Sequence, residues 1–370
     1  MKNQTQDKDL ILTPEKRKGF GEWWEGELDS PLVWITSDFS NWSGPYEGDN
    51  PDSKWLNPGL RIRRFTEKLE SARFFGDSFP YHFVNYGPGI LAGFLGGRIN
   101  FDGETMWIDS TIGEYENLEG ELSLERGNRY WRLVEELTDL SLKESKGSFV
   151  TSITDIGGIM DVLSGMRGVN RLLKDLIRKP QEVKKALKRI KDAWFEAFEY
   201  FSDKLLSQQG CMVAWNGVYS EKPTYTPQND MSCMISPERF REFSLGHIKD
   251  ITERIDRTVY HLDGPGAMKH LEDILSLEEL NAVQWVPGAG APGGANPNSP
   301  YGKNRGMLRW VEDLKKIKDK GKSIELSVHP DDAVPLIQEL GPENLLLKIR
   351  CKNCEEAESI YEATKCVGMK

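Results

Sequence analysis

The stretch YHLDGPG places a histidine and an aspartate one residue apart at the end of an apolar run. In a strand, the alternation of Val259, His261 and Asp263 puts both polar side chains on one face, and the Gly-Pro-Gly that follows ends the strand. An imidazole and a carboxylate at this spacing could both bind a divalent cation, or the carboxylate could orient the ring for proton transfer. The same residues could instead hydrogen-bond the turn, so a reactive pair and a plain strand end are both open.

Polar residues at the ends of other predicted strands provide further candidates. Cys351 ends the last apolar run, LLLKIRC, where a thiolate could face the same side as His261. Asp155 precedes a Gly-Gly turn and could act as a base or accept hydrogen bonds from the backbone of that turn. For His329, between a strand and a helix, hydrogen bonding within the turn is the alternative to a site role. The residues that we predict to bind the substrate are Asn85, Tyr86, Trp215, Trp285 and His329.

Short apolar runs alternate with longer amphipathic helices after residue 75. In residues 183–205 the apolar positions recur every three or four residues, which predicts a helix with one buried stripe. The sequence Ser236-Pro237-Glu238 is typical of a helix start, and residues 307–320 and 332–340 predict two more helices. The predicted strands are residues 79–85, 99–109, 149–156, 211–219, 257–263, 281–286, 323–329 and 345–351.

Eight strands that alternate with helices imply parallel pairing. The predicted fold class is therefore α/β, as a (β/α)8 TIM barrel over residues 76–370, in preference to an open doubly wound sheet. Residues 1–75 predict a tryptophan-rich N-terminal extension that packs on the barrel. Its tryptophans, at positions 23, 24, 34, 42 and 55, favour a packed interface over stacking on sugars or flat ligands. The loop of residues 286–306 predicts a lid over the barrel mouth, with disorder as the alternative.

Composition argues against several classes of partner. The 370-residue chain is 38% hydrophobic and 29% charged, with a formal net charge of −10. This charge, which no basic patch offsets, argues against nucleic acid, and the sequence contains no apolar run of the roughly 18 residues that a bilayer requires. With a polar N-terminus, these features predict a cytoplasmic protein. Five cysteines are too few for a disulfide framework, so reduced thiols are expected.

Five blocks of the sequence, taken in order, resemble a known family. They are NYGPGILAGFLGG, SITDIGGIMDVLSGMRG, MISPERFREF, YHLDGPGAMKHLEDIL and LNAVQWVPGAG. They look like the successive blocks of the uroporphyrinogen decarboxylase superfamily, in particular its bacterial and archaeal branch, over about residues 79–363. The resemblance implies a (β/α)8 barrel with the active site in a cleft at the carboxyl ends of the strands. The RQAGR motif of true uroporphyrinogen decarboxylases is replaced by the tryptophan-rich segment, and Asn85 stands where their aspartate is expected, so porphyrin decarboxylation is not expected.

The chain is also similar to the cobalamin-dependent branch of that superfamily, the coenzyme M-type methyltransferases. That branch holds zinc through a His-x-Cys pair and a distant cysteine. By resemblance, His261 matches the histidine, Asp263 replaces the first cysteine and Cys351 falls near the second. These three residues are the implied ligands of zinc or another divalent metal, in a harder site than one with two thiolates. The resemblance also implies a corrinoid carried on a partner protein, and a homodimer.

These observations lead to three hypotheses for function. The first is a corrinoid-dependent methyltransferase that moves a methyl group between a corrinoid protein and a small acceptor or donor, with His261, Asp263 and Asp155 as catalytic residues. The second is a lyase or decarboxylase of a small organic acid, in which Asp155 or His261 donates a proton and Arg350 or Arg98 binds a carboxylate. The third is a non-catalytic barrel that binds a flat or sugar-like ligand through its tryptophans.

Overall fold

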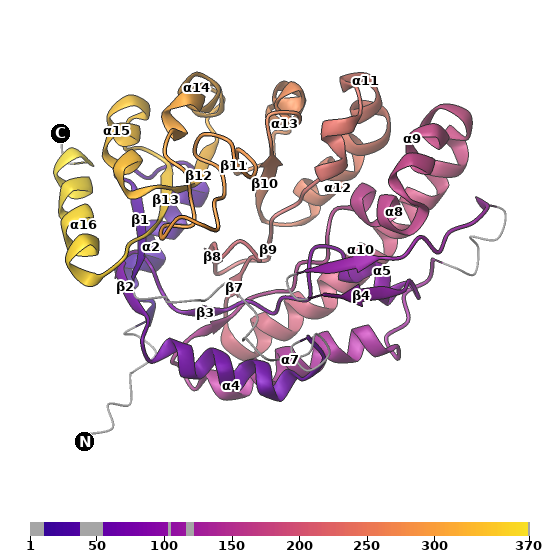
Figure 1. Ribbon diagram of the computed structural model, residues 1–370, viewed down its shortest axis with the longest axis horizontal. Helices are drawn as coiled ribbons and strands as arrows, with labels where there is room; N and C mark the ends of the chain where they lie inside the picture. Colours follow the sequence, from indigo (N-terminus) through magenta and orange to yellow (C-terminus); the bar gives the residue numbers. More distant parts are fainter. Residues whose placement is uncertain (1–10, 38–54, 103–104, 116–121, 369–370) are drawn as a thin grey trace.

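The computed structural model describes residues 11–37, 55–102, 105–115 and 122–368 (Figure 1). Its largest sheet has seven strands in the order β2-β1-β13-β12-β11-β10-β9. Neighbouring strands run parallel throughout this sheet, except that β2 is antiparallel to β1. In sheet order the strands are β2 Arg73–Gly76, β1 Leu32–Ser37, β13 Leu345–Arg350, β12 Ser323–Val328, β11 Ala282–Val286, β10 Arg257–Asp263 and β9 Thr224–Tyr225.

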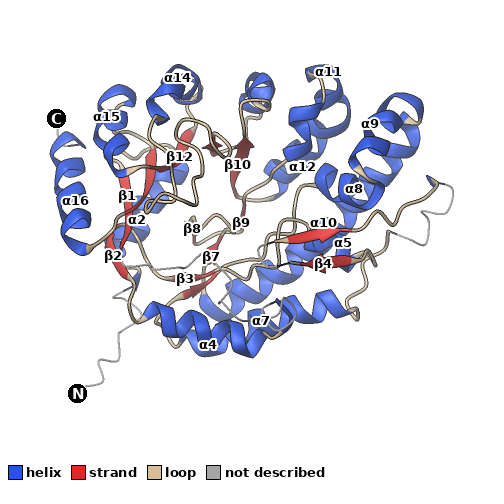
Figure 2. Cartoon of the chain, viewed as in Figure 1, coloured by secondary structure: helices blue, strands red, loops and turns tan. Residues whose placement is uncertain are grey.

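Helices cover the outer face of the sheet, where α14 contacts β12, α15 contacts β13 and α16 contacts β1 (Figure 1). Figure 2 shows the strands gathered inside a surround of helices. No helix in the described part of the chain combines the length and the apolar character that crossing a bilayer demands. The α-helices are α2 Pro14–Glu25, α4 Pro58–Leu69, α5 Ile90–Phe94, α7 Arg129–Ser145, α8 Ile159–Arg167, α9 Val169–Arg178, α10 Pro180–Gln209, α11 Pro237–Phe240, α12 Gly246–Arg254, α13 Leu271–Leu275, α14 Val311–Asp319, α15 Pro330–Leu340 and α16 Cys354–Gly368.

The strands predicted in the C-terminal half of the chain are confirmed. Strands β10, β11, β12 and β13 coincide with the predicted runs 257–263, 281–286, 323–329 and 345–351, apart from single residues at their ends. The helix predicted over residues 183–205 lies within α10, and Val183, Ile190 and Trp194 belong to its buried stripe. This helix ends at Gly210, whose φ of 73° is the left-handed conformation that a glycine C-cap adopts readily.

The closed (β/α)8 barrel predicted from the sequence is not confirmed. In the described residues the other strands form three separate ladders: β3 Tyr81–His82 with β6 Val150–Thr151, β4 Ile99–Phe101 with β5 Met106–Ile108, and β7 Met212–Val213 with β8 Tyr219–Ser220. Prolines limit some of these pairings, because Pro80 precedes β3, Pro223 and Pro227 bracket β9, and proline has no backbone N–H to donate. The runs predicted as single strands at 99–109 and 211–219 are antiparallel pairs that turn back on themselves.

The predicted N-terminal extension supplies part of the main sheet, since β1 lies between β2 and β13. Helix α2 precedes β1, and its Phe20, Trp23 and Trp24 share one buried cluster with side chains of β1, β10, β11 and β13. The tryptophans at positions 23, 24, 34 and 55 are at most 6% exposed, which agrees with the packed-interface interpretation, and Trp34 also lines a cavity. Trp42 lies outside the described residues.

The central strands have an apolar outer face and an inner face that becomes polar along the strand. Leu262, Trp285 and Leu326 belong to the core cluster beneath the helices. On the other face, Val259 and Ala282 pack in the cluster that α2 covers. Two positions farther along each strand, the inner face carries polar side chains, because neighbouring residues of a strand point to opposite faces. This polar layer, at the carboxyl ends of the strands, is where the candidate site lies.

Candidate functional site

Three potential metal ligands gather at the carboxyl end of β10. One ligand atom from each of Asp230, His261 and Asp263 lies within 4.8 Å of the other two. His261 and Asp263 are half-buried and share the inner face of β10, as the alternation in the sequence predicts, and Asp230 is more exposed. The structure therefore brings together two of the three predicted ligands and adds a carboxylate that the sequence analysis missed.

Asp230 reaches this position because the segment after β9 follows β10. Thr224 and Tyr225 pair in parallel with the start of β10, and farther along the backbone N–H of His261 donates to Pro227 O at 2.9 Å. A bridge between Gln228 and His261 extends this pairing. Asp230 begins the 3-10 helix that follows, which sets its carboxylate beside the end of β10.

A row of polar side chains on three neighbouring strands orients the imidazole. The register aligns His261 with Gln284 of β11 and Gln284 with Glu325 of β12. Nδ1 of His261 hydrogen-bonds Gln284 Oε1, and Gln284 Nε2 donates to Glu325 Oε1 at 2.9 Å. Because a carboxylate can only accept, the amide must turn its NH2 to Glu325 and its oxygen to His261, which places the ring proton on Nδ1. The neutral ring then keeps the Nε2 lone pair free for a metal ion.

Glu325 is itself held by charge. Its side chain is fully buried, and Lys348 Nζ of β13 lies 2.6 Å from Glu325 Oε1. Asn216 Nδ2 donates to the second carboxylate oxygen, and Lys348 also donates to the backbone oxygen of Asn216. The buried carboxylate therefore has one cation and two amide donors as partners, and the row that ends at His261 has a defined direction of donors and acceptors.

Trp215 forms one side of the site. Its ring meets the imidazole of His261 edge to face, with centroids 5.3 Å apart and an interplanar angle of 71°. The indole N–H donates to Thr226 O at 2.8 Å, which fixes the ring. The predicted position of Trp215 at the pocket is therefore compatible with the structure, where its ring packs against that of His261.

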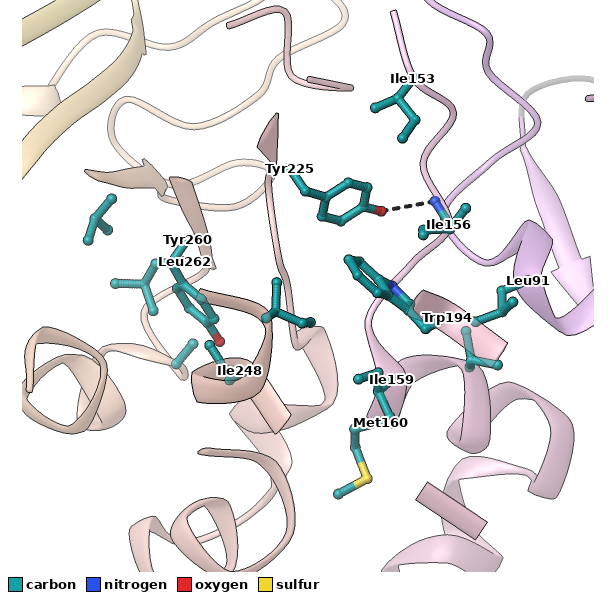
Figure 3. Close-up of a cluster of buried hydrophobic side chains, with 14 of the residues drawn as sticks. Leu91, Ile153, Ile156, Ile159, Met160, Trp194, Tyr225, Ile248, Tyr260 and Leu262 are labelled. Carbon is teal, nitrogen blue, oxygen red and sulfur yellow. Dashed lines mark hydrogen bonds between the residues drawn. The ribbon is translucent and has the colours of Figure 1, made fainter. Parts of the chain in front are cut away.

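Two further carboxyl groups lie near the ligand group. Asp155 Oδ1 accepts from Gly157 N at 2.9 Å and from the Tyr225 hydroxyl at 3.2 Å. Figure 3 shows that this hydroxyl also accepts from Ile156 N, beside the ring of Trp194. Burial raises the pKa of Asp155 to about 6, against the opposing effects of these hydrogen bonds and of the nearby His261. At neutral pH, Asp155 is close enough to its titration midpoint to exchange a proton.

Asp161 and Asp230 interact directly. The backbone N–H groups of Asp230 and Met231 donate to the Asp161 carboxylate at 3.0 and 2.8 Å. Burial and the charge of Asp230 raise the pKa of Asp161 to about 7. Burial, Asp263 and Asp155 raise the pKa of Asp230 to about 7 as well. These carboxylates repel one another, and a cation between them would relieve that repulsion.

Asp155→Asn is expected to change the dependence of stability on pH. The pKa of Asp155 lies near 6 in the folded protein and at its usual 3.8 in the unfolded chain. Its ionisation therefore costs no stability below pH 4, costs more as the pH rises from 4 to 6, and costs a constant amount above pH 6. Asparagine keeps the accepting Oδ1. The variant should therefore be more stable than wild type by roughly 2–3 kcal/mol at pH 8 and equal to it at pH 4. Denaturant unfolding of the metal-free proteins measures both values, and a difference independent of pH would contradict the assignment.

The other predicted substrate-binding residues lie outside this group. Trp285 is 1% exposed on the outer face of β11, where its ring meets Trp310 at 5.1 Å. His329 is the N-cap of α15, and its Nδ1 accepts from Asp331 N at 3.2 Å, as the turn alternative predicted. His329 and Trp285 therefore have structural contacts in place of contacts with the ligand group.

Asn85 and Tyr86 are also engaged elsewhere. Asn85 Oδ1 accepts from Gly87 N at 2.8 Å and shapes the turn after β3. The buried Tyr86 donates its hydroxyl to Leu133 O at 3.1 Å, and the guanidinium of Arg61 lies 4.4 Å from its ring centroid. Both residues hold the local backbone, and a contact with substrate remains a prediction.

Cys351 is not part of the three-residue ligand group. Its side chain is 3% exposed, and its backbone N–H donates to Thr36 O at 2.8 Å. Burial, with a smaller effect of Glu356, raises the pKa of the Cys351 thiol to about 12. The thiol is therefore protonated at neutral pH, a form that binds zinc poorly.

The predicted lid loop, residues 286–306, is folded on itself. Asn304 N donates to Gly294 O at 2.9 Å, and Asp332 of α15 accepts from Gly306 N at 2.8 Å. Lys303 of this loop lies near Asp263 and Glu325: burial lowers the pKa of Lys303, and the two carboxylates oppose that shift. The loop therefore borders the candidate site, and closure over it remains a prediction.

The fold has a counterpart among solved structures. A methyltransferase from Methanosarcina mazei is similar to the chain with a TM-score of 0.56 and 14% sequence identity, over 95% of this chain and 98% of that one. No family model matches the chain, and no curated protein matches it in sequence. The likeness shows a shared overall fold, and membership of the uroporphyrinogen decarboxylase superfamily is not confirmed.

Proposed function

We propose that the protein is a methyltransferase that binds a divalent metal ion between Asp230, His261 and Asp263. The observation that carries the proposal is the convergence of these three side chains, with the imidazole held by Gln284 and Glu325 so that Nε2 is free. The similarity in fold to a methyltransferase supports the choice of reaction. The methyl group would pass between a corrinoid carried on a partner protein and a small acceptor or donor.

The residues of the group fit a divalent ion. Catalytic zinc is commonly held by three protein ligands that leave a fourth position open, and two carboxylates with one imidazole are such a set. Oxygen and nitrogen donors also suit other divalent ions, so the site is harder than one built from thiolates. Burial, with the charges of Asp263 and Asp155, raises the pKa of Asp230, and a bound cation would oppose that shift.

Each residue of the site has a distinct part in the proposed reaction. A bound divalent ion supplies Lewis acidity, which lowers the pKa of a thiol or water at the open position. Gln284 and Glu325 keep the His261 ring in one orientation, and Trp215 limits access of water. Asp155, with a pKa near 6, accepts or returns the proton of the acceptor.

Demethylation of methylcobalamin tests the proposal. We expect wild-type protein loaded with zinc to accelerate transfer of the methyl group from methylcobalamin to a thiol acceptor. The absorbance change of the cobalamin measures the rate. His261→Ala should abolish the acceleration, whereas Cys351→Ser should retain it, because Cys351 lies outside the ligand group. If wild type loaded with zinc, cobalt or manganese accelerates transfer to none of a series of thiols and methoxylated compounds, the proposal is wrong.

The structure also bears on the alternative of ligand binding through tryptophans. Trp23 and Trp24 are at most 2% exposed, and Trp24 Nε1 donates to Tyr219 O at 2.7 Å. Their faces are covered by the core, so they cannot stack on a sugar without unfolding α2 from the sheet.

A further inference from the structure

A cavity of about 250 Å³ opens between β1, β3 and α4, where the described strands β1 and β3 are not paired with each other. Trp34, Phe79 and Tyr81 form an aromatic cluster on one side of it. The Trp34 centroid lies 4.6 Å from that of Phe79 and 5.9 Å from that of Tyr81. These rings are fixed by one another and by Phe20 of α2, so the surface that they present is preformed.

Three more aromatic side chains line the cavity. They are Phe65 of α4, Phe74 of β2 and Phe83 after β3. Phe65 packs edge to face on Phe149, with centroids 4.8 Å apart, which holds its ring in place. A space bounded by aromatic side chains on several elements favours a flat apolar body, because ring faces and edges pack well against another ring. Its volume lies just below the roughly 300–1,000 Å³ of common ligand sites, which suits a ligand of one ring.

Arg350 brings a positive charge to this aromatic cavity. It ends β13 and pairs in register with Thr36 of β1, which also lines the cavity. Among the residues that the structure describes, none donates to, accepts from or forms an ion pair with the Arg350 guanidinium, and no acidic side chain lines the cavity. Burial alone lowers the pKa of Arg350. Burial and Glu325 raise the pKa of Tyr81, so its hydroxyl stays neutral and offers no counter-charge.

A partly buried guanidinium that has no counter-ion among the described residues is costly, and a planar carboxylate satisfies it best through two parallel hydrogen bonds. We propose that this cavity binds a small aromatic carboxylate, with its ring among Trp34, Tyr81 and Phe83 and its carboxylate on Arg350. Thr36 also lines the cavity, and a hydroxyl can donate a further hydrogen bond to a carboxylate. Asp230, His261 and Asp263 do not line the cavity, so this binding does not depend on the metal site or on the proposed methyl transfer.

Calorimetric titration with benzoate tests the site. We expect benzoate to bind wild type and His261→Ala with equal affinity, and Arg350→Met to bind it about 10-fold or more weakly, because a hydrogen-bonded charge is lost. Arg309→Met removes an exposed arginine that does not line the cavity, so it should leave the affinity for benzoate unchanged. Arg350→Lys keeps the charge without the planar fork and should fall between wild type and Arg350→Met.

Matched probes separate the ring from the charge. Benzamide lacks the charge and acetate lacks the ring, so both should bind at least about 10-fold more weakly than benzoate. Benzoate should also raise the thermal midpoint of wild type and leave that of Arg350→Met unchanged. Equal binding of benzoate to wild type and Arg350→Met, equal binding of acetate and benzoate, or no binding of benzoate to wild type would each overturn the proposal. If Arg350→Met does not fold, undiminished binding of benzoate by Arg350→Lys, or equal binding of benzoate and benzamide by wild type, would overturn it as well.

Discussion

His261→Ala is expected to lower the affinity for Zn²⁺ by about 100-fold or more. Loss of residues that only support a ligand costs about 10- to 100-fold, and His261 is the ligand itself in the proposed site. Asp230→Asn should have a comparable effect, because an amide lacks the charge that balances the ion. The affinity of wild type should also fall as pH drops below 7, since the pKa of Asp230 is about 7 and the protonated carboxyl binds metal poorly. Competition titration with a zinc-sensitive dye measures all of these affinities.

Two variants control this experiment. His329→Asn removes a histidine from the N-cap of α15 but supplies another good capping residue, so zinc affinity and stability should both be retained. Cys351→Ser separates the ligand set of the structure from the set implied by resemblance. If Cys351→Ser keeps its affinity for zinc, the result agrees with Asp230 as the third ligand. A loss comparable to that of His261→Ala would instead mean that Cys351 is a ligand and would contradict the group of Asp230, His261 and Asp263.

Glu325→Gln is expected to destabilise the protein by about 3–5 kcal/mol, the usual cost of removing one partner of a buried ion pair. Glu325 is fully buried, and the change leaves the ammonium of Lys348 without its counter-ion 2.6 Å away. It also replaces one carboxylate oxygen with an NH2 donor, so the donors of Gln284, Lys348 and Asn216 can no longer all find an acceptor at position 325. The Gln284 amide is then held less firmly, and zinc affinity should fall together with stability. Denaturant unfolding of metal-free protein gives the first effect, and dye competition gives the second.

The double variant Glu325→Gln with Lys348→Met shows whether the cost comes from the unpaired charge. Removal of both charges commonly restores much of the stability that a single removal costs, and contacting residues are not additive. Recovery of stability without recovery of zinc affinity would separate the two roles of Glu325. A loss below about 1 kcal/mol in the single variant would mean that the pair contributes as little as a surface ion pair, against its burial.

The parts of the fold that the sequence predicts well are those governed by local periodicity. Strand β10 and the stripe of α10 follow from alternation and from three-to-four spacing, and both are confirmed. Closure of the sheet depends on pairing between distant segments, where prolines such as Pro80 and Pro223 remove donors. The helix-covered sheet was therefore predictable, whereas the extent of each ladder was not.

The candidate site was half predictable for the same reason. His261 and Asp263 follow from alternation in one strand, but Asp230 lies 31 positions before His261 and comes close to it through the parallel pairing of residues 224–228 with β10. A signal for the supporting row was present in the sequence: Gln284, Glu325 and Lys348 each stand between two apolar neighbours in a strand. A polar side chain inside a buried strand needs a hydrogen-bond partner. When three neighbouring strands each carry such a side chain, the sequence predicts that the three side chains bond to one another.

The position of β1 has a consequence for the order in which the chain folds. Leu32 of β1 pairs beside Leu346 of β13, and Leu28 N donates to Asn344 Oδ1 across 316 positions. Contacts between such distant segments form slowly, because a long loop must close before they contribute. During synthesis β1 cannot pair with β13 until nearly the whole chain has emerged. Until then, the edge of β1 that pairs with β13 is open to wrong partners. Removal of β13 from the end of the chain would leave β1 without its parallel neighbour. We therefore infer that the pairing of β1 with β13 is the last step in forming this sheet.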